Sequence, residues 1–390
     1  MKLGNTQRLI FAGIAAVLFV VSAYAQTATP VATPFGLKMA DGKTVDEMIE
    51  PSGVVAIGDS GYLLVASDKD KDGNTGLSLY VVEAKTGKFI KLLENIQGNT
   101  KNPKWEALAK DADCYYYAIG SHSVDRPDDP AAKLAVRSRL FRFRLKGEAA
   151  GDPLAISMDL GVKEFDIKTS LTKFGIYDVI PNTDPKKIMA KIEGLAVRTV
   201  SGQKQLVIGL REPFDKAGRV QIYSVEFPAD SQAATPTLLT LKPFFQFAAD
   251  RPKDSPEPYK LSSIEYLAEL KGFLILTSTE SKSNDFYGNA MWFVSDTDIE
   301  TARITSKTDG DYPVTAKPIW DFPHDPADKN YVEMKAEGIS LLPATTVGKT
   351  RLVIVYDNDP QSTHTDGKPH PSMMECLEMT TDFKISRVGC

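Results

Sequence analysis

The chain has 390 residues, 42% of them hydrophobic and 25% charged, with a formal net charge of −5 at pH 7. This composition is typical of a soluble globular protein with a sizeable core. The basic residues are scattered and form no clustered face, so nothing in the sequence favours nucleic acid as a partner.

Residues 1–25 have the pattern of a secretory signal peptide. Lys2 and Arg8 are followed by an apolar run over residues 9–21 and by small residues that suit cleavage before Gln26. The apolar run is too short for a comfortable membrane span, although an uncleaved N-terminal anchor is the alternative.

Residues 26–34 are rich in Thr, Ala and Pro, which predicts a flexible tether, and residues 35–390 then form a single domain. No second hydrophobic run is long enough to cross a membrane. We expect an exported, soluble monomer, periplasmic or secreted, without membrane contact after cleavage of the signal peptide.

One unit recurs along this domain: a glutamate leads a short strand, a turn follows, and a more apolar strand comes next. The leading residues are Glu50, Glu106, Glu193, Glu265 and Glu337. Each unit can be read as about four strands. In the second they lie near residues 106–109, 115–119, 139–145 and 155–159, and in the third near residues 193–197, 206–210, 220–226 and 238–241. Five four-stranded repeats predict an all-β fold, a β-propeller of five blades.

A sixth blade is the alternative count. It would be built from residues 161–189 together with residues 35–39. Otherwise the long segment 161–189 is expected to be a surface excursion that covers one end of the central channel.

Several phrases of the repeat resemble a known group of proteins. They are residues 105–109 with 120–123, residues 192–196 with 208–211, and residues 335–338 with 355–359. They look like a bacterial propeller family of unknown function, which is similar to the group called "esterase-like activity of phytase". The resemblance spans nearly the whole mature chain and implies a propeller fold, with a phytase-like or esterase-like hydrolase activity.

The propeller geometry predicts where the chemistry lies. The innermost strand of each blade lines the channel, so the leading glutamates and the residues that close the second strands should meet at one mouth. In the five units the closing residues are Asp68, His122, Arg211, Glu280 and Asp357. Confined carboxylates repel one another unless they share protons, pair with bases or hold a cation.

Calcium is the first choice for such a cation because it is hard and prefers oxygen ligands. The candidate ligands are Glu50, Glu106, Glu193, Glu337, Asp68 and Asp357. His122 is the candidate general base and Arg211 the partner of an anion or oxyanion. The alternative is that the glutamates cap backbone amides of the neighbouring blade and have a structural role.

Two functions therefore follow from the sequence. The first is a metal-dependent hydrolase of a small ester, lactone or phosphoester at the channel mouth. The second is a non-catalytic periplasmic binding or scaffold propeller with a structural glutamate ring. The propeller fold by itself does not decide between them.

Three smaller motifs have simple interpretations. Residues 68–74 resemble the first half of a calcium loop, but Leu79 stands where a bidentate glutamate is needed. Residues 58–61, Gly-Asp-Ser-Gly, predict a β-turn rather than a serine nucleophile. Cys376 and Cys390 are expected to form a disulfide in an oxidising compartment, and Cys114 to be a small buried hydrophobe.

Overall fold

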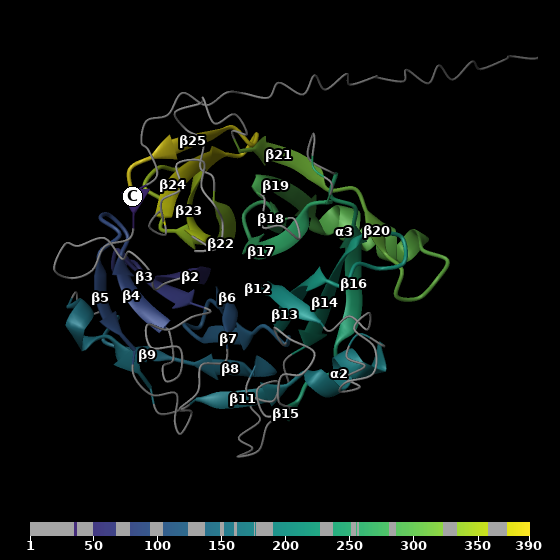
Figure 1. Cartoon of the computed structure of the whole chain (residues 1–390), viewed down its shortest axis with the longest axis horizontal. Helices are drawn as coiled ribbons and strands as arrows, with labels where there is room; N and C mark the ends of the chain where they lie inside the picture. The colour runs from purple at the N-terminus through teal and green to yellow at the C-terminus, as the bar shows by residue number, and fades with distance from the viewer. Residues whose placement is uncertain are drawn as a thin grey trace, which may run out of the picture.

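The computed structural model describes residues 35–36, 50–67, 79–93, 104–123, 137–148, 152–159, 162–174, 176, 190–226, 237–250, 255, 257–280, 286–322, 334–357 and 373–390. In these residues the protein is a ring of five β-sheets, the blades of a propeller (Figure 1). Among them there is no helix long and apolar enough to cross a membrane. The predicted signal peptide, tether and calcium-like loop lie outside the described residues.

The first two blades are formed as follows. Blade 1 contains β2 (Pro51–Ile57), β3 (Tyr62–Ser67), β4 (Leu79–Glu83) and β5 (Phe89–Leu92). Blade 2 contains β6 (Trp105–Lys110), β7 (Tyr116–Gly120), β8 (Leu140–Phe143), β11 (Lys163–Asp166) and the short parallel strand β15 (Thr237–Leu238).

The next two blades follow the same plan. Blade 3 contains β12 (Lys191–Val200), β13 (Gln203–Glu212), β14 (Val220–Glu226), β16 (Lys242–Phe247) and β20 (Pro313–Val314). Blade 4 contains β17 (Lys260–Leu267), β18 (Gly272–Glu280), β19 (Phe286–Ser295) and β21 (Lys317–Asp321).

Blade 5 combines the two ends of the domain. It contains β22 (Lys335–Leu342), β23 (Lys349–Asp357) and β24 (Met373–Thr380), and the outer edge of β24 pairs with both β25 (Ile385–Val388) and β1 (Phe35–Gly36). The remaining elements are β9 (Leu145–Lys146), β10 (Ser157–Met158), the short helix η2 (Pro153–Ala155), α2 (Lys168–Lys173) and α3 (Asp296–Thr305).

The five innermost strands surround the axis and contact one another in the order β2, β6, β12, β17, β22 and back to β2. Figure 1 shows them facing the middle of the ring. The prediction of a five-bladed, all-β propeller is therefore confirmed, and the sixth blade is wrong. Of the residues proposed for it, β11 is an outer strand of blade 2 and β1 is an outer strand of blade 5.

Two outer strands differ from the prediction. In blade 2 the expected strand near residues 155–159 instead forms the separate β9–β10 ribbon, and β11 takes the place beside β8. In blade 3 the strand beside β14 is β16 rather than residues 238–241. Leu239 and Leu241 are instead buried between blades 2 and 3.

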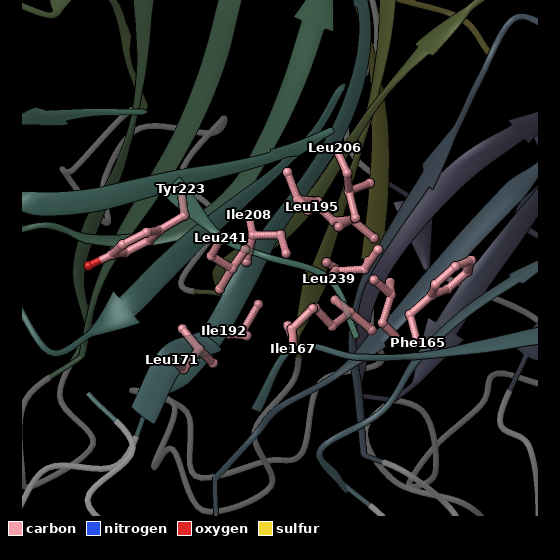
Figure 2. Packing of buried hydrophobic residues seen from close by; sticks show 14 of the residues in the cluster. Phe165, Ile167, Leu171, Ile192, Leu195, Leu206, Ile208, Tyr223, Leu239 and Leu241 are labelled. Carbon is pink, nitrogen blue, oxygen red and sulfur yellow. The ribbon is translucent and has the colours of Figure 1, made fainter. Parts of the chain in front are cut away.

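The packing between blades 2 and 3 shows why these segments were misplaced. Ile167 and Leu171, from α2 and the residue before it, join Ile192 and Ile208 of blade 3 in one buried cluster (Figure 2). A blade buries both of its faces against its neighbours, so apolar segments beyond its own strands can add to this interface. The part of the 161–189 excursion that is described thus packs into the core.

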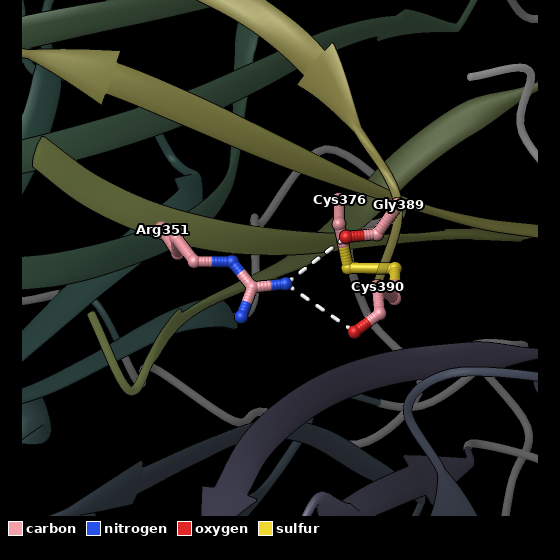
Figure 3. The surroundings of a disulfide bond; sticks show 4 residues. All are labelled: Arg351, Cys376, Gly389 and Cys390. Carbon is pink, nitrogen blue, oxygen red and sulfur yellow. Dashed lines mark hydrogen bonds between the residues drawn. A yellow bond between two sulfur atoms is a disulfide. The ribbon is translucent and has the colours of Figure 1, made fainter. Parts of the chain in front are cut away.

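A disulfide fastens the closing blade, as predicted. Cys376 on β24 bridges to Cys390, with their Cα atoms 5.2 Å apart. Arg351 on β23 donates hydrogen bonds to the carbonyl oxygens of Gly389 and Cys390 at 3.0 and 3.3 Å (Figure 3). The prediction for Cys114 is wrong, because this residue is exposed in the turn between β6 and β7.

Candidate functional site

Each innermost strand has a β-bulge near its beginning. The pairing with the second strand shifts between Pro51 and Gly53 in blade 1, and at the matching place in every other blade. The residues at the bulge are Ser52, Glu106, Glu193, Ser262 and Glu337. Three blades therefore present a glutamate at this position and two present a serine.

A small residue follows the bulge in all five blades, and the crowding of neighbouring strands explains it. A Cβ atom on Gly53 would lie 2.9 Å from the backbone nitrogen of Leu108, on the innermost strand of the next blade. A Cβ atom on Gly338 would lie 3.1 Å from the nitrogen of Val54. The small residue after the bulge thus marks a place where one blade closely approaches the next.

This register corrects two of the predicted leading glutamates. Glu50 lies two residues before the bulge of blade 1. Glu265 lies three residues after the bulge of blade 4, near the other end of β17. Neither is structurally equivalent to Glu106, Glu193 and Glu337, and the sequence similarity around Glu265 is coincidental.

Lysines that the sequence reasoning overlooked complete the site. Two residues before the bulge stand Lys104, Lys191, Lys260 and Lys335, and blade 1 has Glu50 there. The signal was present in the sequence, because Lys-x-Glu occurs three times and Lys-x-Ser once at the start of an innermost strand. We call the end of the propeller where these five strands begin the start face, and the opposite end the turn face.

The lysines contact the ring carboxylates. The Nζ of Lys191 lies 2.9 Å from Oε1 of Glu193, and the Nζ of Lys104 lies 3.7 Å from Oε1 of Glu106. Lys335 pairs with Glu337 and lies 3.8 Å from Oδ2 of Asp357. Cations of the chain itself therefore compensate these acids.

Lys260, on blade 4, turns to acids beyond its own strand. Its Nζ lies 2.7 Å from Oε1 of Glu212 on blade 3 and 3.8 Å from Oε2 of Glu257. This matches the serine at the bulge of blade 4, Ser262, which offers no carboxylate. We name the whole set the charged ring: Glu50, Lys104, Glu106, Lys191, Glu193, Arg211, Lys260, Lys335, Glu337 and Asp357.

Arg211 joins blade 3 to blade 4 inside this ring. Its guanidinium is buried and its Nη1 donates to Oε2 of Glu193 at 3.0 Å and to the carbonyl oxygen of Leu261 at 3.1 Å. The same nitrogen lies 3.3 Å from Oγ of Ser278, whose hydroxyl is 2.6 Å from that of Ser262. The two serines of blade 4 thus accommodate the arginine of blade 3.

Charged groups of different blades influence one another's pKa values. Burial alone would raise the pKa of Glu193, but Arg211, Lys191 and Lys335 together lower it. Burial alone would lower the pKa of Lys191. The negative charges of Glu193 and Glu106 outweigh the effect of burial, so the pKa of Lys191 is raised. Lys335 belongs to blade 5 and Glu106 to blade 2, so these influences act between blades.

The second strands place fewer of the predicted residues in the ring. On each second strand, one residue pairs with the residue just before the bulge of the innermost strand. Arg211 and Asp357 directly follow that residue, as predicted. In blades 2 and 4 this position is Ser121 and Ser278 rather than His122 and Glu280, which lie one and two residues further on. Asp68, its counterpart in blade 1, lies outside the described residues.

His122 is a poor match for a general base. The residue is fully buried at a positive φ of 56° and its backbone N–H donates to the carbonyl oxygen of Arg137 at 3.2 Å. Burial, with a smaller effect of Lys168, lowers the pKa of His122 to about 3. The imidazole is therefore neutral at physiological pH and binds a proton only weakly.

Glu265 is the carboxyl group that stands apart from the ring. It is half-buried on β17, where burial raises its pKa to about 8, against a smaller lowering effect of the Tyr266 backbone N–H. The residues at the same distance past the bulge in the other blades are Val55, Ala109, Ala196 and Ser340. Glu265 is thus a protonated acid at neutral pH in a position that other blades fill with small or apolar side chains.

A metal centre was predicted among the ring carboxylates. Within the described part of the chain, no three side chains among His, Cys, Asp and Glu are grouped so that they could hold a metal ion. Glu106, Glu193 and Glu337 project from different blades, and each has its own lysine. The calcium site, which included Asp68, stays a prediction.

The sequence matches no protein-family model and no curated protein. Solved structures do resemble it in fold. A thermostable family-43 glycoside hydrolase aligns over 92% of this chain and 96% of its own, with 10% identity and a TM-score of 0.45. An α-L-arabinofuranosidase from Lactobacillus brevis aligns over 87% and 94%, with 14% identity and a TM-score of 0.43. An exo-β-1,3-galactanase from Clostridium thermocellum aligns over 92% and 64%, with 10% identity and a TM-score of 0.48. Similarity this distant concerns the fold alone.

Proposed function

We propose that this protein is an exported, non-catalytic binding propeller that holds a small molecule over the charged ring of its start face. The observation that carries the proposal is the exchange of glutamate for serine at the bulge. Ser52 and Ser262 stand in two blades where Glu106, Glu193 and Glu337 stand in the others. Blades of this protein therefore close without a carboxylate, so closure does not explain the glutamates.

The energetics of buried charge support the same conclusion. Taking a carboxylate and an ammonium group out of water costs several kcal/mol per ion, and their attraction often no more than offsets that cost. Three such pairs in one ring are thus an expensive way to pack an axis that two blades pack with serine. Charges retained at this cost favour a binding role.

The ion pairs also make the ring a preorganised site. Glu193 is held by Arg211 and Lys191, and Glu337 by Lys335, so the lysine side chains are oriented before any ligand arrives. Preorganised groups lose less conformational entropy on binding. The signal-peptide pattern of residues 1–25 supports a ligand met outside the cytoplasm.

Hydrolysis of a small ester, lactone or phosphoester is the second candidate function, and one observation favours it. A general acid must carry its proton at neutral pH, and Glu265, with a pKa raised to about 8, is such a group. Arg211, the predicted oxyanion partner, is bound to Glu193 at the beginning of β17, and Glu265 lies near the other end of that strand. His122, with its pKa lowered to about 3, is unsuited to the role of base.

Calcium belongs to this second candidate. The proposed ligands are Glu50, Glu106, Glu193, Glu337, Asp68 and Asp357, and the cation would polarise the substrate or activate water. To bind them it would have to displace lysines that now contact Glu106, Glu193 and Glu337.

A matched pair of variants tests the location of the site. Glu257 lies beside Lys260 at the start of β17, and Glu269 is exposed in the turn at its other end. Thermal shifts with citrate, inorganic phosphate, glucose, trehalose and choline would identify a class of ligand for the wild-type protein. We expect Glu257→Trp to abolish the shift by obstructing the start face, and Glu269→Trp to preserve it. A shift that survives Glu257→Trp and disappears in Glu269→Trp would place the site on the turn face.

A further inference from the structure

Three Lys–Glu pairs of the charged ring are layered, with the lysine more exposed than the glutamate. The side chains of Glu106, Glu193 and Glu337 are 5%, 1% and 4% exposed. Those of their lysine partners Lys104, Lys191 and Lys335 are 18%, 27% and 16% exposed. In each pair the carboxylate therefore lies beneath, and the lysine side chain belongs to the exposed layer, which solvent reaches in part.

The bulge explains this layering. Lysine and glutamate are two residues apart in each of blades 2, 3 and 5, with the lysine nearer the strand's beginning and the start face. The bulge inserts the glutamate as an extra residue where the next blade is in close contact. The glutamate is thereby enclosed, while the long lysine side chain extends toward water.

The cationic layer is concentrated around one point. Lys191 and Lys335 come from blades 3 and 5, yet both lower the pKa of Glu193, as Arg211 does. Glu193, Glu337 and Asp357 balance these three cations in number, but Lys191 and Lys335 are the more exposed members of their ion pairs. On the blade between them, Ser262 and Ser278 stand in place of carboxylates, and the nearby acids Glu212 and Glu257 are paired with Lys260.

We infer that the start face binds a small anion, with a carboxylate or phosphate group held by Lys191 and Lys335 above the buried Glu193 and Glu337. This inference rests on the proposed binding function and adds the chemical class of the ligand. The lysines supply charge-assisted hydrogen bonds to the oxygens of the anion. The buried glutamates weaken the attraction and fix the positions of the lysines.

Two substitutions in one ion pair test this inference by acting in opposite directions. Lys335→Gln removes an ammonium group from the exposed layer, and we expect it to weaken the binding of inorganic phosphate or citrate by about tenfold. Glu337→Gln removes the carboxylate beneath it, and we expect tighter binding, because Lys335 is then less neutralised. The double variant Lys335→Gln/Glu337→Gln leaves no unpaired member of the ion pair and should bind as weakly as Lys335→Gln.

The measurement is isothermal titration of the purified full chain with phosphate and separately with citrate, which distinguishes the two anion types. Circular dichroism and a melting curve establish that each variant is folded, and the double variant serves if Lys335→Gln alone does not fold. Lys85→Gln is the control, because Lys85 is exposed in the turn between β4 and β5, on the turn face. We expect this control to bind as the wild-type protein does.

The outcomes separate this inference from the proposed function. Weaker binding in Lys335→Gln with tighter binding in Glu337→Gln supports both. A neutral ligand could instead lose its binding in Glu257→Trp and keep it in Lys335→Gln. That result would support the binding function and overturn the inference that the ligand is an anion. Anion binding that neither substitution alters also overturns it, because the anion then lies elsewhere. If no probe binds, both are wrong.

Discussion

Two buried glutamates of this protein, Glu193 and Glu375, have almost the same exposure, but their pKa values are shifted in opposite directions. Glu193, in the charged ring, is 1% exposed, and Glu375, on β24, is 2% exposed. The pKa of Glu193 is lowered, whereas burial keeps that of Glu375 raised despite its contacts with Arg387 and Tyr356. Burial is common to the two sites, so the difference lies in the number of cations.

The partners make the two roles clear. Glu375 accepts a hydrogen bond from Arg387 Nε at 2.5 Å and another from the Tyr356 hydroxyl, and both partners are themselves buried. That cluster compensates one buried charge inside the closing blade. Glu193 is influenced by Arg211, Lys191 and Lys335, and the two lysines extend to the surface. The first arrangement is enclosed within one blade, and the second reaches the start face, where we propose that a ligand binds.

Breaking the enclosed cluster should have the largest effect on stability. Arg387→Met leaves Glu375 buried with no arginine beside it, and we expect the free energy of unfolding to fall by about 3–5 kcal/mol. Chemical denaturation measures it. Lys384→Met, which breaks an exposed ion pair with Asp382 on the same blade, is the control and should change little. Equal losses in the two variants would show that burial of the Glu375 cluster does not matter.

Removing the charge of Glu193 should cost less, because its lysines can turn to water. We expect Glu193→Gln to lower the free energy of unfolding by about 2 kcal/mol at pH 7, mostly through the buried Arg211. Because the pKa of Glu193 is lowered in the folded protein, its carboxylate stabilises the fold above the ordinary pKa of 4.5. This stabilisation is lost as the pH falls below that value. The difference from wild type should therefore be constant from pH 5 to 8 and shrink in acid. A difference that grows in acid contradicts the assigned ion pairs.

Glu265 should give an effect of the opposite sign, and the size of this effect should depend on the pH. Its pKa is raised from 4.5 to about 8, so between these values the folded protein holds a proton that the unfolded chain releases. Stability that this group contributes is therefore lost as the pH rises. We expect Glu265→Gln to be the more stable protein at pH 8, with the difference growing by about 1 kcal/mol per pH unit from pH 5. Denaturation curves at four pH values measure it, and parallel profiles would mean that the pKa of Glu265 is ordinary.

Much of the fold could be predicted from the sequence, because it follows from repetition. Five copies of a strand–turn–strand pattern indicate five blades, and Cys376 and Cys390 flank the last strand pair closely enough to suggest their disulfide. The outer strands were harder to predict. β16 and the segment before it are both apolar, and only the packing between blades 2 and 3 decides which of them pairs with β14.

The site could be predicted only in part, since its register depends on the bulge. A β-strand pattern repeats every two residues and does not reveal where one strand gains an extra residue. The sequence pattern therefore indicates Glu265 as the equivalent of Glu193, although Ser262 holds that place. The lysines two residues before the bulge could have been found, because a carboxylate confined in a ring needs a neighbouring cation and the sequence supplies one at a constant spacing.

The most direct test of this account asks what neutralises the ring carboxylates. Elemental analysis of protein purified from its native compartment, with melting curves with and without a chelator, separates lysine from calcium. If the ion pairs hold the ring, the melting temperature is unchanged by chelator and by added Ca²⁺, and Lys335→Gln lowers it. The contradicting result is stoichiometric bound Ca²⁺ whose removal lowers the melting temperature of the wild-type protein but not that of Glu193→Gln.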